Sequence, residues 1–372
     1  MGEENRVSCA KVMQELFFEL LQITLGNRDC FTKIPSSKEW GALYKLACKQ
    51  SLESVLLDGV NKAKNFDSEI GINQSLVLEW IGVGLQTEAR NKVQNERSKE
   101  LCQLFRNGGY RCTILKGQGT ALYYDHQEHR QCGDIDVWVE GSRDEVLSFL
   151  RQQRYKIGHV DIKHADVEIF EDVHVEVHFR PSWMYSPSTN KRLSRLFSSK
   201  VDSQFANQDS EAGFTHATID FDLVYSMVHI YRHIFSEGIG LRQLVDYYYI
   251  LQRSTEELRK EAYGVLCSFR MKSFVGGVMW ILCECFGMKK ELALCPLNER
   301  HGIFLLSEIM TAGNFGHYDD RTRQISKDKK FKRGFVQLGR NLRFVSYYPS
   351  EVLWSPFWKL WHWCWRKRKG YL

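Results

Sequence analysis

The chain has 372 residues, 43% of them hydrophobic and 26% charged, a composition typical of globular proteins. Its length exceeds that of a usual single hydrophobic core, so we expect two or three packed units. No run approaches the roughly 18 consecutive apolar residues of a spanning helix, and the N-terminus, with Glu3 and Glu4, has no secretory signal pattern. We therefore expect a cytoplasmic protein.

The net charge of +6 comes from the C-terminal part of the chain. Residues 321–372 contain 14 Lys or Arg against Asp328 and Glu351, a balance of +12, so residues 1–320 sum to −6. The 11 cysteines are scattered and include no C-x-x-C pair. This spacing favours reduced thiols in apolar surroundings over a zinc site or a disulfide framework.

Residues 8 to about 105 are predicted to be helical, because apolar residues recur there at helical spacing. Gly26 is a plausible end for the first helix, and Pro35 opens the second segment. A third apolar stretch begins at Leu78 and continues into a charged helix over residues 88–105. We expect this part to be a helical bundle without chemistry of its own.

The pattern changes after Gly108 and Gly109. Residues 110–115 resemble a short strand, residues 116–119 read Lys-Gly-Gln-Gly, and residues 120–124 resemble a helix. A glycine-containing turn between a strand and a helix leaves backbone N–H groups free for a phosphate. The alternative is that the turn only joins two elements.

Two acids stand one residue apart in an apolar run at residues 133–139, Gly-Asp-Ile-Asp-Val-Trp-Val. Because strand side chains alternate, Asp134 and Asp136 should share one face and the apolar residues the other. A second strand at 173–179, the partner of 167–170 in a predicted hairpin, has apolar residues at odd positions and His174, Glu176 and His178 opposite them.

Such acids suit a divalent metal, which binds hard oxygen ligands and assists phosphoryl chemistry. Asp134 and Asp136 with Glu176 would supply the ligands. Lys116, Arg130 and the backbone of Gly117 and Gly133 would then be available for a triphosphate. The alternative for the two aspartates is a solvated strand edge.

Together these segments resemble the polymerase-β-like nucleotidyltransferase superfamily. The series is Leu115-Lys116-Gly117 with Ala121-Leu122-Tyr123, then Arg130-x-x-Gly133-Asp134-Ile135-Asp136, then His174-Val175-Glu176-Val177-His178. Within the superfamily the chain is similar to a largely uncharacterised bacterial family that has Leu-Lys-Gly in place of the usual Gly-Ser loop. The resemblance covers residues 110–180 and, more loosely, 219–250.

The resemblance implies a small mixed β-sheet backed by helices, and an NTP as donor. It also implies two-metal catalysis by Asp134, Asp136 and Glu176 with Mg²⁺ or Mn²⁺. The expected nucleotide-site residues are Lys116, Gly117, Arg130, Gly133, His178 and Arg180. His174 and His178 could instead ligate a transition metal, but the carboxylates beside them favour magnesium.

Helical patterns return from residue 219 and continue to about residue 310. His229 and His233 have the four-residue spacing of a metal-binding pair, and packed or hydrogen-bonded histidines are the expected alternative. Arg242 and Asp246 either pair along their helix or face the nucleotide.

We expect an α+β fold in four parts. These are an N-terminal helical region (1–107), a nucleotidyltransferase α/β core (108–215), a helical domain (216–312) and a basic, tryptophan-rich C-terminal tail (313–372).

The tail predicts an amphipathic helix at residues 353–372. Ser355 is a suitable N-cap and Pro356 a suitable first helical residue. The expected apolar face holds Phe357, Trp358, Trp361, Cys364 and Trp365, and the polar face holds Lys359, His362 and Arg366.

Such a helix suits the interface of an anionic membrane, here its inner face. The alternative is a terminal helix whose tryptophans pack on the body. Nucleic acid is a further alternative partner for basic residues 321–343 with Tyr347 and Tyr348, although no recognised binding module frames them.

The sequence thus predicts a metal-dependent nucleotidyltransferase that moves an NMP from an NTP to an acceptor hydroxyl or phosphate and releases pyrophosphate. A sugar phosphate, a small metabolite, an RNA end and a protein side chain all remain open as acceptors. The alternative function is a non-catalytic member of the same fold that binds a nucleotide or a partner and docks at a membrane through its C-terminal helix.

Overall fold

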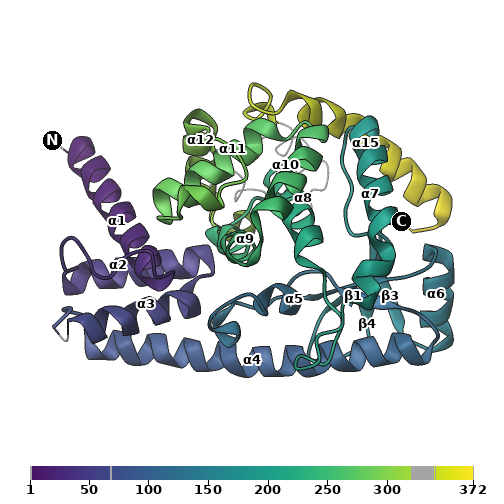
Figure 1. Ribbon diagram of the computed structural model, residues 1–372, viewed down its shortest axis with the longest axis horizontal. Helices are drawn as coiled ribbons and strands as arrows, with labels where there is room; N and C mark the ends of the chain where they lie inside the picture. Colours follow the sequence, from purple (N-terminus) through teal and green to yellow (C-terminus); the bar gives the residue numbers. More distant parts are fainter. Residues whose placement is uncertain (1, 68, 320–338, 340, 372) are drawn as a thin grey trace.

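The computed structural model describes residues 2–67, 69–319, 339 and 341–371. Helices surround a mixed sheet of five strands, which confirms the predicted α+β fold (Figure 1). Most of the basic stretch at 321–343 lies outside the described residues. The four-part domain division stays a prediction.

The N-terminal region is helical, as predicted. It consists of α1 (Gly2–Thr24), α2 (Ser37–Gln50), α3 (Glu53–Phe66) and α4 (Gln74–Asn107). α4 has 34 residues, and at 1.5 Å per residue it is about 50 Å long. It runs along one side of the whole molecule and joins the other N-terminal helices to the sheet (Figure 1).

The sheet has the strand order β1-β2-β5-β4-β3. Its strands are β1 (Cys112–Ile114), β2 (Ile135–Val139), β3 (Lys156–Val160), β4 (His164–Glu168) and β5 (Val175–His178). β2 and β5 are parallel and the other pairs are antiparallel. The predicted hairpin is the β4–β5 pair, and α5 (Gln118–Ala121), η1 (Gln127–His129) and α6 (Arg143–Gln152) connect the earlier strands.

The two faces of the sheet pack against different helices, as the alternation in β2 predicts. On one face Ile135, Val137 and Val139 share a core with residues of α4 and α6. On the other face Trp138 packs against α7 (Pro187–Ala206) and α8 (Ile219–Ser236), with its ring centroid 4.8 Å from Phe205 and 5.9 Å from Phe221. Asp136 of β2, and Asp134 just before the strand, therefore face the helices that follow the sheet.

The helices after the sheet share one large core with the N-terminal helices. Besides α7 and α8 they are α9 (Leu241–Arg253), α10 (Glu256–Ser268), α11 (Lys272–Trp280), which continues as η2 (Ile281–Cys285), and α12 (Glu299–Ala312), with short turns η3 (Lys290–Leu292) and η4 (Asn314–Gly316). This common core places α8 and α9 beside the acidic face of the sheet.

The structure corrects the predicted start of the C-terminal helix. α15 (Pro349–Lys369) begins before Ser355, which is therefore not its N-cap, and Pro356 lies inside the helix. The earlier start has a packing reason. The carboxylate of Glu351 accepts hydrogen bonds from the backbone N–H groups of Tyr185 and Ser186, at 2.8 and 3.2 Å.

The faces of α15 also differ from the prediction. Trp358 stacks on Trp183 with ring centroids 3.7 Å apart, and Trp365 packs beneath Arg143. His362 lies between the two tryptophans, on the side expected to be polar. The remaining tryptophans of α15 are exposed, so the helix divides its aromatic residues between the body and the surface. No helix among the described residues is both long enough and apolar enough to cross a bilayer.

Candidate active site

Three carboxylates meet where β2 lies beside β5. The parallel register pairs Asp136 directly with Glu176. Oxygen atoms of Asp134, Asp136 and Glu176 all lie within 4.8 Å of one another, and Asp136 is only 1% exposed. The predicted acids are thus brought together, because β5 pairs with β2 even though β3 and β4 come between them in the chain.

Glu176 is held by histidines from two strands. Nδ1 of His164 lies 2.6 Å and Nε2 of His178 3.2 Å from Oε2 of Glu176. Burial alone would raise the pKa of Glu176, but these hydrogen bonds and the nearby Lys163 hold it well below its ordinary value. Glu176 therefore stays ionised, which suits a metal ligand better than a proton acceptor.

His164 is a site residue that the sequence did not predict. It lies on β4 directly opposite His178, and the alternation of His164, Asp166 and Glu168 with apolar Ala165 and Val167 could have revealed it.

Asp136 lies between two donors. Nζ of Lys116 is 3.0 Å from its Oδ2, and Nε2 of His178 is 2.9 Å from its Oδ1. Burial alone would raise the pKa of Asp136, but Lys116 and His178 lower it. The charge of Asp136, together with burial, raises the pKa of Asp134. Asp134 is thus the carboxylate of the cluster whose charge the surroundings favour least, and a cation beside it would relieve this.

Asp134 and Asp136 open onto a pocket between the sheet, α8 and α9. Its lining consists of Lys116, Gly117, Thr120, Arg130, Gly133, Asp134, Asp136, Tyr225, Ser226, His229, Ile230, Arg242, Gln243, Asp246 and Phe315. Four of the six predicted nucleotide residues are in this lining. His178 instead lies behind the carboxylates, and Arg180 is not part of the lining.

The cationic side of the pocket is organised by α9. Nε and Nη2 of Arg130 donate to the two carboxylate oxygens of Asp246 at 2.8 and 2.9 Å, and Tyr124 donates its hydroxyl to the same carboxylate at 2.6 Å. Asp246 therefore orients Arg130 across the pocket.

Arg242 has a different role from the one expected in a pair with Asp246. Its Nη1 donates to the backbone oxygen of Gln131 at 2.8 Å, and its buried Nε has no hydrogen-bond partner among the described residues. Burial, with the neighbouring Arg130, lowers the pKa of Arg242. Arg242 thus brings an uncompensated donor to the pocket wall, as an anion-binding group would.

The segment before β2 is held by α4. Nδ2 of Asn91 donates to the backbone oxygens of Glu128 and Arg130 at 2.7 and 2.9 Å, and Nε2 of Gln94 donates to that of Gly133 at 2.6 Å. Neither residue was predicted from the sequence. They belong to a buried polar row at helical spacing, Thr87, Asn91, Gln94 and Ser98.

The remaining histidines behave differently from one another. His174 is exposed. The rings of His229 and His233 lie 4.2 Å apart, but the two do not belong to any group of described residues arranged to hold a metal. His229 lines the pocket, where burial, followed by the charge of His233, holds its pKa well below its ordinary value.

The α+β fold and the acidic, cation-lined site are those that the resemblance to nucleotidyltransferases implies. The chain belongs to a family described as "Uncharacterised nucleotidyltransferase", whose model matches residues 36–286, most of the chain. The match runs from the N-cap of α2 to the end of η2 and includes the whole sheet and both helices of the pocket. A search of curated proteins finds no match.

Proposed function

We propose that this protein is a metal-dependent nucleotidyltransferase of the polymerase-β-like type. It transfers an NMP from an NTP to an acceptor hydroxyl or phosphate. The acceptor oxygen, which loses its proton to solvent water where it is a hydroxyl, forms a bond to the α-phosphorus. The bond from that phosphorus to the oxygen that bridges it to the β-phosphorus breaks, and pyrophosphate leaves. The observation that carries the proposal is the pairing of Asp136 with Glu176 beside Asp134.

The donor set fits a hard divalent cation, because it consists of carboxylate oxygens close to one another. Asp134, Asp136 and Glu176 would hold Mg²⁺ or Mn²⁺, which when bound neutralises phosphate charge and favours in-line displacement. His164 and His178 keep Glu176 ionised and oriented. Lys116 and Arg242 bind the phosphates, with Arg130 fixed beside them by Asp246 and with Gly117 and Gly133 at the pocket wall.

Asp136→Asn tests this assignment. We expect the variant to lose magnesium-dependent NTP binding and to release pyrophosphate roughly 10²–10³-fold more slowly, as when a preorganised electrostatic group is removed. Equilibrium titration with and without magnesium and a pyrophosphate assay measure the two effects. Glu168→Gln is the control, because it changes an exposed acid of β4 that pairs with Lys156 of β3. Unchanged binding and turnover in Asp136→Asn would exclude the proposed site.

The acceptor is found by mass spectrometry of the products formed from labelled NTP in a cell lysate. The competing proposal is a non-catalytic member that binds nucleotide only. It predicts tight magnesium-dependent NTP binding by the wild type without turnover on any acceptor.

We also propose that α15 docks the protein on an anionic membrane. Its exposed apolar residues are Leu353, Trp354, Phe357, Leu360, Trp361 and Trp363. At 3.6 residues per turn all but the last fall within an arc of about 120°. The opposite side packs on the body through Glu351 and Trp358, so this arc faces outward.

The charge of the helix favours an anionic lipid surface as the binding partner of this arc. Lys367 and Arg368 are exposed at the C-terminal end of the arc. Tryptophan with basic residues on one helix is the composition of an interfacial helix, and the cations attract anionic headgroups.

Vesicle co-sedimentation tests the membrane proposal. We expect binding to phosphatidylglycerol-containing vesicles, weaker binding to phosphatidylcholine alone and less binding as salt rises. The double substitution Phe357→Glu and Trp361→Glu should reduce partition by roughly tenfold or more. Leu78→Glu on α4 is the matched control, because Leu78 is 63% exposed and Phe357 67%. Unchanged partition in the double variant, or a dimer in light scattering without vesicle binding, would overturn the proposal.

A further inference from the structure

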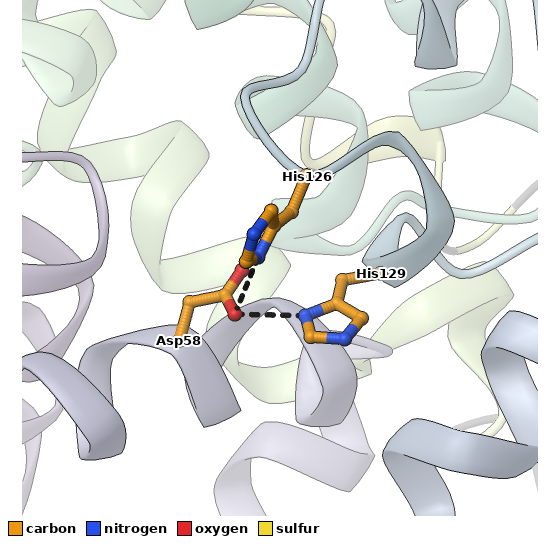
Figure 2. A group of neighbouring side chains, drawn as sticks. All are labelled: Asp58, His126 and His129. Carbon is orange, nitrogen blue, oxygen red and sulfur yellow. Dashed lines mark hydrogen bonds and ion pairs between the residues drawn. The ribbon is translucent and has the colours of Figure 1, made fainter.

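A second cluster of metal-ligating side chains lies away from the acids of the sheet, between α3 and the segment that leads into β2. Figure 2 shows Asp58 of α3 with His126 and His129 of that segment. Both imidazoles direct Nδ1 at the same carboxylate oxygen of Asp58, at 2.9 and 2.8 Å. One ligand atom from each of the three residues lies within 4.8 Å of the others.

A fourth residue, Glu88, contacts the ring of His129 at the nitrogen that does not face Asp58. Nε2 of His129 lies 3.0 Å from a carboxylate oxygen of Glu88 on α4. If this nitrogen carries the proton and donates it to Glu88, Nδ1 keeps its lone pair, which then points toward Asp58 and His126. Histidines that bind metals commonly donate their other N–H to a carboxylate in this way.

The cluster is both anchored and accessible. The side chains of His129 and Asp58 are 12% and 15% exposed, whereas that of His126 is 68% exposed. Two ligand groups are thus held by the fold, and the third lies at the surface, where an ion can enter.

We propose that Asp58, His126 and His129 bind a zinc-class divalent cation, with solvent completing the coordination. Two imidazole nitrogens and one carboxylate oxygen suit Zn²⁺ or Co²⁺ better than Mg²⁺, which prefers oxygen ligands alone. The proposal does not depend on the proposed transferase activity.

A bound ion would tie the N-terminal helices to the active-site pocket. His129 immediately precedes Arg130, and Asn91 of α4 already holds the backbone of this segment. The ion would add a cross-link from α3 at the same place, so zinc should also raise the thermal unfolding temperature of the full chain.

Calorimetric titration of the full-length protein with Zn²⁺ tests the site, with excess Mg²⁺ present to occupy the carboxylates of the sheet. We expect one zinc ion per chain that His126→Ala weakens at least tenfold, and a weakening of roughly 10–100-fold in Glu88→Gln. His126 is exposed, so its replacement should leave the fold intact. His159→Ala, which removes an exposed histidine of β3, is the matched control. Absorption bands of bound Co²⁺ report the ligand set independently.

Equal zinc affinity in the wild type and His126→Ala, or no zinc binding by the wild type, would overturn the proposal. The contacts would then be an ion-pair cluster in which a protonated His129 bridges Asp58 and Glu88. Neither result affects the magnesium-dependent NTP titration of Asp136→Asn, so the two proposals can fail separately.

Discussion

Asp246 and Arg130 illustrate how single residues build the pocket. Their side chains are 13% and 4% exposed and meet through two hydrogen bonds. A buried charge without its partner is costly, so each residue depends on the other. The pair also determines where the positive charge of Arg130 lies relative to Asp134 and Asp136.

Asp246→Asn should destabilise the protein by about 3 kcal/mol, because it leaves a buried guanidinium without its counter-charge. Asp125→Asn is the control, because it breaks an exposed Asp–Arg pair with Arg253 that should contribute less than about 1 kcal/mol. Urea unfolding of both variants gives the comparison, and equal losses would contradict the burial argument.

The same pair predicts a pH dependence. Burial alone would raise the pKa of Asp246, but Arg130 lowers it below the ordinary value of 3.8. A lowered pKa means that the carboxylate stabilises the fold above pH 3.8, and that this contribution is lost as the pH falls below that value. The difference in unfolding free energy between the wild type and Asp246→Asn should therefore be constant near neutral pH and shrink below that value. A constant difference down to acid unfolding would contradict the assignment.

Among the elements, α4 combines two functions. One side contributes Phe105 and Leu101 to the core under the sheet, and its buried polar row fixes the backbone between Glu128 and Gly133. Charged residues stand between these polar positions in the sequence, which hides the row from a search for apolar periodicity.

The start of α15 also depends on tertiary contacts. The hydrogen bonds of Glu351 start the helix before the Ser355–Pro356 cap that the sequence predicts.

Gln94→Leu should destabilise the protein by about 1–3 kcal/mol, because the carbonyl of Gly133 loses its donor. It should also weaken magnesium-dependent NTP binding, because Asp134 follows Gly133 directly. Gln103→Leu changes an exposed glutamine on the same helix and should affect neither property. Urea unfolding and nucleotide titration measure the two effects, and similar results for both variants would argue against a positioning role for Gln94.

At the scale of the whole molecule, one core joins the N-terminal helices, the helices after the sheet and the start of α15. The candidate active-site pocket lies where the sheet meets these helices, with walls from α5, β2, α8 and α9. The exposed arc of α15 is separate from this pocket, so the proposed membrane docking and the proposed nucleotide binding would use different surfaces.

The variants Trp358→Ala and Trp354→Ala should separate the contribution of α15 to protein stability from its proposed contribution to vesicle binding. Trp358 stacks on Trp183, and because it is half-buried its loss should cost about 2 kcal/mol, less than a fully buried tryptophan. Trp354 is 44% exposed, and its loss should change stability by less than about 0.5 kcal/mol while reducing vesicle binding. Thermal unfolding and co-sedimentation of both variants test this, and the reverse order of effects would contradict the assigned faces of α15.

The sequence by itself determined the helical character of residues 8–105 and 219–310, the hairpin, and the faces shared by Asp134 with Asp136 and by Glu176 with His178. These features follow from the period of the backbone, which acts between near neighbours in the chain. The sequence did not predict α7 or the start of α15. Only the tertiary structure decided that β5 lies beside β2, that Asp246 binds Arg130, and which side of α15 is exposed. Each of these depends on sheet order and on core packing between segments that are distant in the chain. The local periodicity of a sequence does not specify which distant segments pack together.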